Sequence, residues 1–197
     1  MRKRTTAYCT VLLLGALFGC AHDQQGPIIY PIATGSHAFN YSVMEKPHRY
    51  IVWSTHPTVT ASVTQVLQSN RQTVVERAQL NRAFDEQRIR LTHTSDDETQ
   101  LLRVGKLIGA DQIVFADHTS DKDNRNLYRL MVRVRAVDVE TGEIKWNGSA
   151  WYPERMVEEE SGLFKLAAVA MFRATCMVER GAKWTAYSAS GGGCSKK

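Results

Sequence analysis

The sequence predicts an α/β fold in which helices pack on a mixed β-sheet within one domain. Two observations lead to this prediction. Between residues 72 and 117, short apolar runs of strand length enclose two segments whose apolar residues recur at helical spacing. Between residues 127 and 151, two apolar runs flank a turn and predict a β-hairpin. Because each unit has an apolar face to bury, one sheet covered by helices accounts for both.

The first elements predicted are a strand at 49–53 and a helix at about 58–70. Apolar residues of the second segment recur at spacings of four, three and one, which places them on one helix face: Val59, Val63, Val66 and Leu67. A short apolar run at 73–75 predicts the next strand. Leu80, Ala83 and Phe84 then predict the helix that follows it.

A second central helix has a signal at each end. Ser95 stands three residues before Glu98, which is the pattern of a capping box. The helix is expected to stop at Gly109, because glycine enters the left-handed region without strain. The apolar run at 112–116 predicts the next strand, and the polar residues 117–126 predict a connector.

The hairpin begins with the longest strand signal in the chain, over 127–139. One face of this strand should be covered, because its apolar residues Leu130, Val132, Val134 and Ala136 alternate with Met131, Arg133 and Arg135. At Val137 and Val139 the apolar phase shifts by one residue. This shift indicates either a bulge near Ala136 or burial on both faces. Gly142 marks the turn, and 144–151 is the returning strand.

A C-terminal helix is predicted from about Gly162 to Val178. Glu158, Glu159 and Glu160 precede it, where carboxylates complement the positive end of a helix. The domain is therefore expected to span 48–180. A flexible tail is predicted over 181–197.

The N-terminus has the pattern of a secretion signal. Arg2, Lys3 and Arg4 precede an apolar run at 7–18, which is too short for a stable membrane span. The sequence Leu17-Phe18-Gly19-Cys20 resembles the lipobox of bacterial lipoproteins, whose cysteine is lipidated and becomes the first mature residue. We therefore predict a signal peptide over 1–19. A lipidated tether is predicted over 20–47, where prolines and glycines are scattered without a sustained period.

Processing at Cys20 would change the charge and the location of the chain. Removal of 19 residues from 197 leaves 178, and loss of three cations lowers the formal net charge from +5 to +2. The basic pI is therefore no reason to expect a nucleic-acid partner. Acyl chains on Cys20, such as palmitate, would hold the domain at a membrane surface. Ala21 stands where similar lipoproteins of the inner membrane carry aspartate, which implies the outer membrane with the domain facing the periplasm.

Cys176 and Cys194 are the remaining cysteines of the mature chain, since Cys9 is lost with the leader. In an oxidising compartment they could form a disulfide. The alternative is that Cys176 is a buried apolar residue of its helix and Cys194 is a free thiol of the tail. The sequence leaves both interpretations open.

Three motifs over about 50–151 resemble the CsgG-type family of curli assembly and transport lipoproteins, in order and in approximate spacing. They are Val74-Val75-Glu76-Arg77 with Leu80 and Glu86-Gln87, then Gly105-Lys106-Leu107-Ile108-Gly109-Ala110-Asp111 with Ile113-Val114, then Val137-Asp138-Val139-Glu140-Thr141-Gly142-Glu143-Ile144. The resemblance implies an α/β domain similar to the amino-terminal domain of TolB and to LpoB. Channel-forming members insert long transmembrane hairpins, whereas here only the short segment 117–126 joins the two central strands.

The resemblance and the signal together imply a lipoprotein that contacts envelope proteins in cell-envelope assembly or secretion. Two alternatives remain. One is an oligomeric secretion channel of the curli type, which implies a homo-oligomer, and the other is an LpoB-like activator of a peptidoglycan synthase. We expect no enzyme, cofactor or metal, because the sequence has no Gly-x-Ser-x-Gly, no phosphate-binding glycine loop and no His-Glu-x-x-His.

Arg129, Arg133 and Arg135 are the candidate contact residues. They share one strand with Met131, at alternate positions, and could form a basic strip that binds an acidic partner. The alternative is a solvated sheet face. Trp146 and Trp151 on the returning strand are interpreted as packing residues rather than as a sugar-binding platform.

Overall fold

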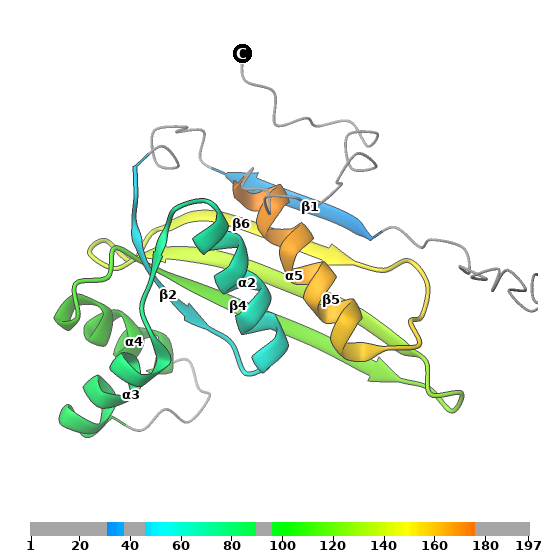
Figure 1. Cartoon of the computed structure of the whole chain (residues 1–197), viewed down its shortest axis with the longest axis horizontal. Coiled ribbons are helices and arrows are strands. Elements are labelled where there is room, and N and C mark those ends of the chain that lie inside the picture. Colours follow the sequence, from blue (N-terminus) through cyan, green and yellow to red (C-terminus); the bar gives the residue numbers. More distant parts are fainter. Residues whose placement is uncertain (1–30, 38–45, 90–95, 176–197) are drawn as a thin grey trace, which may run out of the picture.

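The computed structural model describes residues 31–37, 46–89 and 96–175 (Figure 1). In these ranges six strands form one sheet in the order β1-β6-β5-β4-β2-β3, and four helices pack against it. The strands are β1 (Ile32–His37), β2 (Arg49–Trp53), β3 (Thr73–Val74), β4 (Gln112–Lys122), β5 (Tyr128–Asp138) and β6 (Ile144–Trp151). The helices are α2 (Pro57–Ser69), α3 (Arg77–Glu86), α4 (Asp96–Leu107) and α5 (Glu159–Thr175). Strand β2 is parallel to β3 and β4 and the other pairs are antiparallel, so the predicted α/β fold with a mixed sheet is confirmed.

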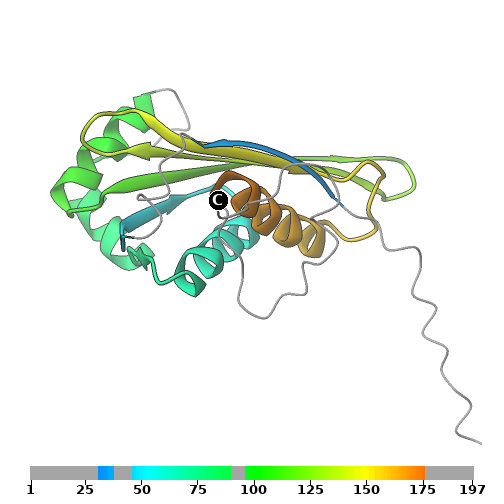
Figure 2. The same cartoon turned by 90° about the horizontal axis from the view of Figure 1, so that it is seen from above.

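Helices α2 and α5 lie on one side of the sheet, which we call the covered face (Figure 2). The predicted inward residues of β5 point to this side, and Leu130, Val132 and Val134 are at most 2% exposed. Helix α5 approaches β6 closely at Gly148, where a Cβ atom would come within 2.5 Å of the carbonyl oxygen of Ala170. The larger apolar cluster of the domain therefore lies between the sheet and these two helices.

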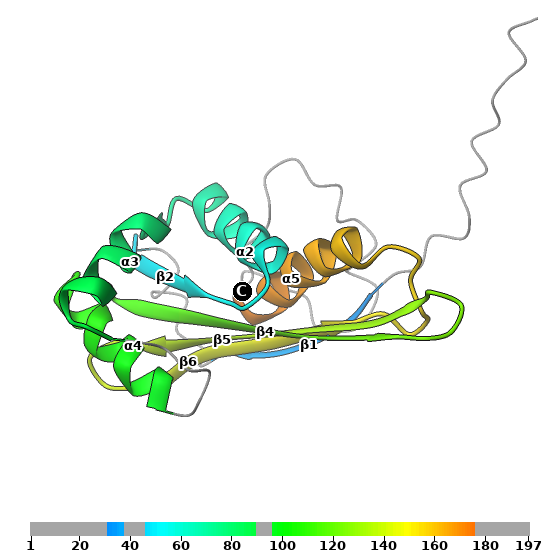
Figure 3. The same ribbon diagram turned by 90° about the horizontal axis from the view of Figure 1, so that it is seen from below.

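Helices α3 and α4 pack at one end of the molecule, against the opposite face of the sheet (Figure 3). Leu80 of α3 and Val104 of α4 belong to a second apolar cluster with Ile113, Val137 and Val139. The β4–β5 hairpin extends away from this end (Figure 3). In the described part of the chain, no helix covers the rest of this face.

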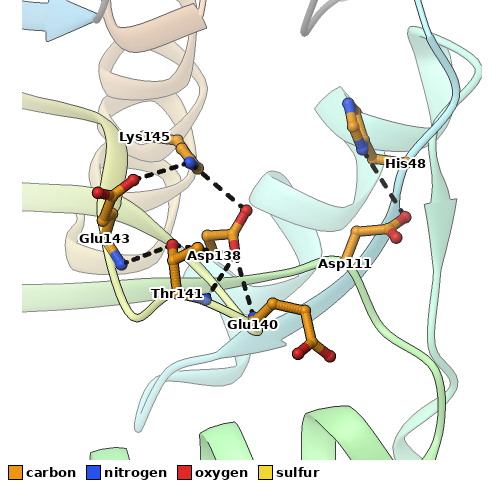
Figure 4. A network of polar contacts seen from close by, with 7 residues as sticks. All are labelled: His48, Asp111, Asp138, Glu140, Thr141, Glu143 and Lys145. Atoms are coloured by element: carbon orange, nitrogen blue, oxygen red, sulfur yellow. Dashed lines mark hydrogen bonds and ion pairs between the residues drawn. The ribbon is translucent and has the colours of Figure 1, made fainter.

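Asp111 fixes the start of the central strand β4 (Figure 4). Its Oδ2 atom accepts a hydrogen bond of 2.7 Å from the backbone N–H of Arg49 and lies 3.7 Å from Nδ1 of His48. These contacts hold β4 beside β2. Gly109, just upstream, has a φ of 68°, which confirms the predicted left-handed end of the helix.

Asp138 organises the turn between β5 and β6 (Figure 4). Its Oδ1 atom accepts hydrogen bonds from the backbone N–H groups of Glu140 and Thr141, at 3.0 and 2.9 Å. Burial alone would raise the pKa of Asp138, but the hydrogen bonds from Thr141 and the charge of Lys145 bring it below its ordinary value. Gly142 has a φ of 72°, as the predicted turn requires.

One strand is longer than the sequence predicts, and another was not predicted. Six of the ten residues of the predicted connector, 117–122, belong to β4, which continues to Lys122 and pairs with β5 as far as Tyr128. A backbone ladder needs no apolar side chains, so this exposed stretch leaves no apolar pattern. Residues 32–37, which fall in the predicted tether, form β1 against β6. Of its described side chains only Ala33 packs against the core, which explains the weak strand signal.

The apolar pattern shifts by one residue at the end of β5, and both suggested causes, a bulge and burial on both faces, are present. The register between β5 and β6 shifts between Ala136 and Val137. Val137 and Val139 are also buried, on the face opposite to Ala136, against α3 and α4. The predicted end of the last helix at Val178 lies outside the described residues, as does Ser95.

Candidate interaction surface

The uncovered part of the sheet is the candidate site, and we call it the open face. It lies on the side of α3 and α4, beyond the end that these helices cover (Figure 3). Its members follow from the strand register, because residues directly opposite each other in a sheet share a face. They are Ile32 and Thr34 of β1, Ser149 and Trp151 of β6, Arg129, Met131 and Arg133 of β5, and Asp117, Thr119 and Asp121 of β4.

An apolar row crosses the open face. Ile32, Trp151 and Met131 are direct neighbours on three consecutive strands. Ile32 is 45% exposed, and Trp151 and Met131 are partly exposed. A contiguous apolar group on a surface is typical of a site that contacts another molecule.

Two arginines flank the apolar row on β5. Arg129 and Arg133 are both exposed, one on each side of Met131. They pair in register with Asp121 and Asp117 of β4. None of the ion pairs among the described residues involves either guanidinium. Each can therefore present its planar set of donors to a carboxylate on another molecule.

Arg135 is engaged within the chain. Its two terminal nitrogens donate hydrogen bonds of 2.8 Å to both carboxylate oxygens of Glu98, and its guanidinium carbon lies 4.4 Å from the ring centroid of Phe115. The hydrogen bonds from Arg135 lower the pKa of Glu98. The Glu98 side chain, which the sequence assigns to a capping box, thus joins α4 to β5. Arg135 marks the border between the helix-covered end and the open face.

Arg155 holds the end of the β4–β5 hairpin. It donates hydrogen bonds to the backbone oxygens of Asp121 and Leu127, at 3.0 and 3.2 Å, and to Oδ2 of Asp121 at 3.2 Å. Within the loop, Oδ1 of Asp123 accepts hydrogen bonds from two backbone N–H groups. The bond from Leu127 lowers the pKa of Asp123. The Asp121 carboxylate is therefore already paired within the chain, with Arg155.

The covered face has a cavity of about 750 Å³ at the start of α5. None of the candidate site residues named from the sequence lines this cavity. Two of its glutamates, Glu159 and Glu160, form the first turn of α5, as expected from the helix dipole. The cavity is lined by Thr58, Tyr128, Val157, Glu158, Glu159, Glu160, Ser161 and Phe164.

The candidate residues from the sequence fall into two groups. The three arginines lie on one side of β5, as predicted, with Arg129 and Arg133 on the open face. Cys20, Cys176 and Cys194 lie outside the described residues, so lipidation and the disulfide stay predictions.

Among the described residues, no group of three or more His, Cys, Asp or Glu side chains is placed to hold a metal ion. In the same ranges, every helix is too short or too polar to cross a membrane.

Sequence reasoning missed the apolar row. Ile32 falls in the predicted tether, and its role depends on pairing with β6, which no local pattern reveals. Trp146 is 2% exposed, whereas Trp151 is partly exposed on the open face. The two tryptophans are five positions apart, so the alternation along 144–151 places them on opposite faces of the strand. This signal could have distinguished the buried tryptophan from the partly exposed one.

Comparisons with known proteins identify no family. No protein-family model and no curated protein match the chain, so the CsgG-type resemblance is not confirmed. Solved structures with a similar fold include the PelC dodecamer from Paraburkholderia phytofirmans, with a TM-score of 0.45 and 9% identity over 72% of this chain and 95% of that one. Others are lipoprotein GNA1162 from Neisseria meningitidis (0.45, 20%, over 64% and 94%) and the LpoB C-terminal domain from Escherichia coli (0.40, 15%, over 58% and 95%). Because these scores are below 0.5, we base no functional inference on them.

Proposed function

We propose that this chain is an outer-membrane lipoprotein that faces the periplasm and acts by protein–protein contact in envelope assembly or secretion. The open face is its contact surface. The observation that carries this proposal is the asymmetry of the sheet. Helices α2 and α5 bury the residues of one face, while Ile32, Met131 and Trp151 stay partly or largely exposed on the other.

The chemistry of the open face suits a protein partner. Aromatic residues, methionine and arginine are enriched in protein interfaces, and all three occur here together as Trp151, Met131 and the pair Arg129 and Arg133. The partner that fits best presents apolar side chains beside carboxylates, because each arginine can bind a carboxylate through two hydrogen bonds.

The lipobox-like sequence supplies the proposed anchor at Cys20. Since β1 belongs to the sheet, only the segment between Cys20 and Ile32 separates the anchor from the domain. Fully extended, these residues would span at most roughly 40 Å. The open face would therefore work close to the membrane that holds the lipid.

The two alternatives make different use of this face. A secretion channel of the curli type requires copies of the chain to contact one another. An LpoB-like activator requires contact with a peptidoglycan synthase. Both are contacts between proteins, so the identity of the bound molecule separates them.

Photo-crosslinking in intact cells tests the proposal. A photoreactive amino acid replaces Met131 on the open face or, as a matched control, the exposed Lys165 on the outer side of α5. We expect a discrete adduct from position 131 and none from position 165. An adduct that contains only this chain would favour the channel, and one that contains a synthase would favour the activator. Equal labelling from both positions, or no adduct from position 131, would refute the open face as the contact surface.

The anchor is tested separately with a Cys20→Ser variant. We expect this variant to leave the membrane fraction, because a chain without acyl groups has no hydrophobic anchor. Unchanged membrane association would refute lipidation at Cys20, whatever the crosslinking shows.

A further inference from the structure

Two histidines meet on the covered face, away from the proposed contact surface. His56 directly precedes α2, and His118 lies on β4. Their ring centroids are 4.8 Å apart and the rings are inclined at 69°, an edge-to-face contact. His118 is paired in register with the buried Val132, so it shares the side of the sheet on which α2 and α5 pack. The contact therefore joins the start of α2 to the sheet.

Each ring has a buried nitrogen atom, and the surroundings of His118 suit the neutral form of histidine. The Nδ1 atom of each ring is buried and has no hydrogen-bond partner. A neutral imidazole can leave this nitrogen without a proton, but an imidazolium carries an N–H on both ring nitrogens. Protonation would therefore bury an N–H group without an acceptor, which is unfavourable.

Charge also opposes protonation of His118. Its ring lies against the cap residue of α2, where the helix dipole presents its positive end. Two imidazolium rings at 4.8 Å would repel each other. Burial, followed by the neighbouring His56, lowers the pKa of His118. The charges of Glu159 on α5 and of Asp117, the preceding residue of β4 on the opposite face of the sheet, favour the protonated form and offset this effect only in part.

We propose that the His56–His118 contact is a pH-sensitive latch, which holds the first turn of α2 on the sheet at neutral pH and releases it at mildly acidic pH. The backbone oxygen of His56 accepts hydrogen bonds from the N–H and the hydroxyl of Thr60, at 3.1 and 3.2 Å. Displacement of His56 thus disturbs the first turn directly. Thr58 of this turn lines the cavity at the start of α5, so release of the latch also changes the shape of that cavity.

The direction of the pH effect follows from the two states of the chain. A histidine in the released or unfolded state titrates near its ordinary pKa of about 6.5, whereas His118 in the latch titrates below that value. The released state therefore binds protons first as the pH falls. The latch is fully stable above about pH 6.5 and weakens as the pH falls from there to the lowered pKa of His118.

Hydrogen exchange of the full chain tests the latch. Backbone exchange over residues 60–66 is compared at about pH 7.5 and about pH 5.5, after correction for the intrinsic pH dependence of exchange. In the unmodified chain we expect several-fold faster corrected exchange at the lower pH in this segment, and no such change in the β4–β5 hairpin. His118→Gln should abolish the pH difference.

The matched control is His48→Gln, which removes a histidine that lies beside Asp111 and outside the latch. This variant should keep the full pH difference in α2. If His118→Gln fails to fold, His56→Gln removes the other ring and provides the same comparison. A pH difference that survives in the latch variants, or that is absent from the unmodified chain, would overturn the proposal.

Discussion

The two faces of the sheet differ although the same strands build both. On β5, Leu130 is fully buried under α5, while its neighbour Met131 remains partly exposed beside Trp151. The covered face is filled with apolar residues in close contact. The open face combines apolar and charged residues with few partners in the chain. This difference indicates that the covered face determines stability, whereas the open face can change with little effect on the fold.

The largest effect on stability is expected from truncation on the covered face. Leu130→Ala should lower the free energy of unfolding by about 2–5 kcal/mol, because it leaves a cavity in the core. Met131→Ala, one position along the strand, should cost less than about 1 kcal/mol. Urea denaturation of the two variants measures the difference. Similar losses for both would show that the open face is also part of the core.

A smaller effect is expected from added volume beneath α5. Gly148→Ala should destabilise the fold by about 1–3 kcal/mol, because the new methyl group meets the Ala170 carbonyl oxygen and the Ala174 side chain. Ser149→Ala is the matched control. It adds no volume beneath α5 and removes only an exposed hydrogen bond of 3.0 Å to Thr34, so it should change stability by less than about 1 kcal/mol. Thermal unfolding would distinguish the two variants. A neutral Gly148→Ala variant would contradict the close approach of α5 to β6.

The ion pair between Arg135 and Glu98, at the border between the helix-covered end and the open face, is expected to contribute less to stability. Glu98→Gln should lower stability by about 0.5–1 kcal/mol at neutral pH, because the Glu98 side chain that pairs with Arg135 is 37% exposed and screened by solvent. The pKa of Glu98 is lowered in the folded chain, so its contribution is present above pH 4.5 and is lost as the pH falls through the lower folded pKa. Urea unfolding from pH 7 to about pH 3 should therefore show the difference between variant and unmodified chain shrinking.

Glu154→Gln serves as the control for this pH series. Glu154 is exposed and belongs to none of the ion pairs among the described residues. Its substitution should leave the pH dependence of stability unchanged. A constant difference between Glu98→Gln and the unmodified chain at all pH values would argue against the ion pair.

The smallest effect on stability is expected on the open face itself. The double variant Arg129→Gln/Arg133→Gln should change the free energy of unfolding by less than about 0.5 kcal/mol, since both side chains are exposed and the substitution places no like charges opposite Asp121 and Asp117. Denaturation in urea checks this expectation. A large loss of stability would mean that these arginines serve the fold rather than a partner.

Features of the fold that depend on local backbone chemistry were predictable from the sequence. Gly109 and Gly142 mark a helix end and a turn because positive φ angles favour glycine. The inward residues of β5 follow from strict alternation, and Leu130, Val132 and Val134 are buried as expected. The three arginines share a side of β5 for the same geometric reason.

Features that depend on distant partners were not predictable. Strand β1 exists through its pairing with β6, far away in the sequence, and of its described side chains only Ala33 packs against the core. The outer half of β4 pairs through backbone atoms, while its side chains are polar and mostly exposed. The ion pair of Arg135 with Glu98 joins elements that no spacing rule connects. These are the elements that surround the open face, so the proposed contact surface was the least predictable part of the domain.

The central claim is that the open face binds a protein partner, and crosslinking from position 131 tests it most directly. The measurement compares the unmodified chain with the Arg129→Glu/Arg133→Glu variant in intact cells, at equal protein levels. We predict a discrete adduct that is lost or strongly reduced in the variant, because the reversed charges would repel a carboxylate-bearing partner. An adduct of equal yield in both chains would contradict the role of these arginines in the contact.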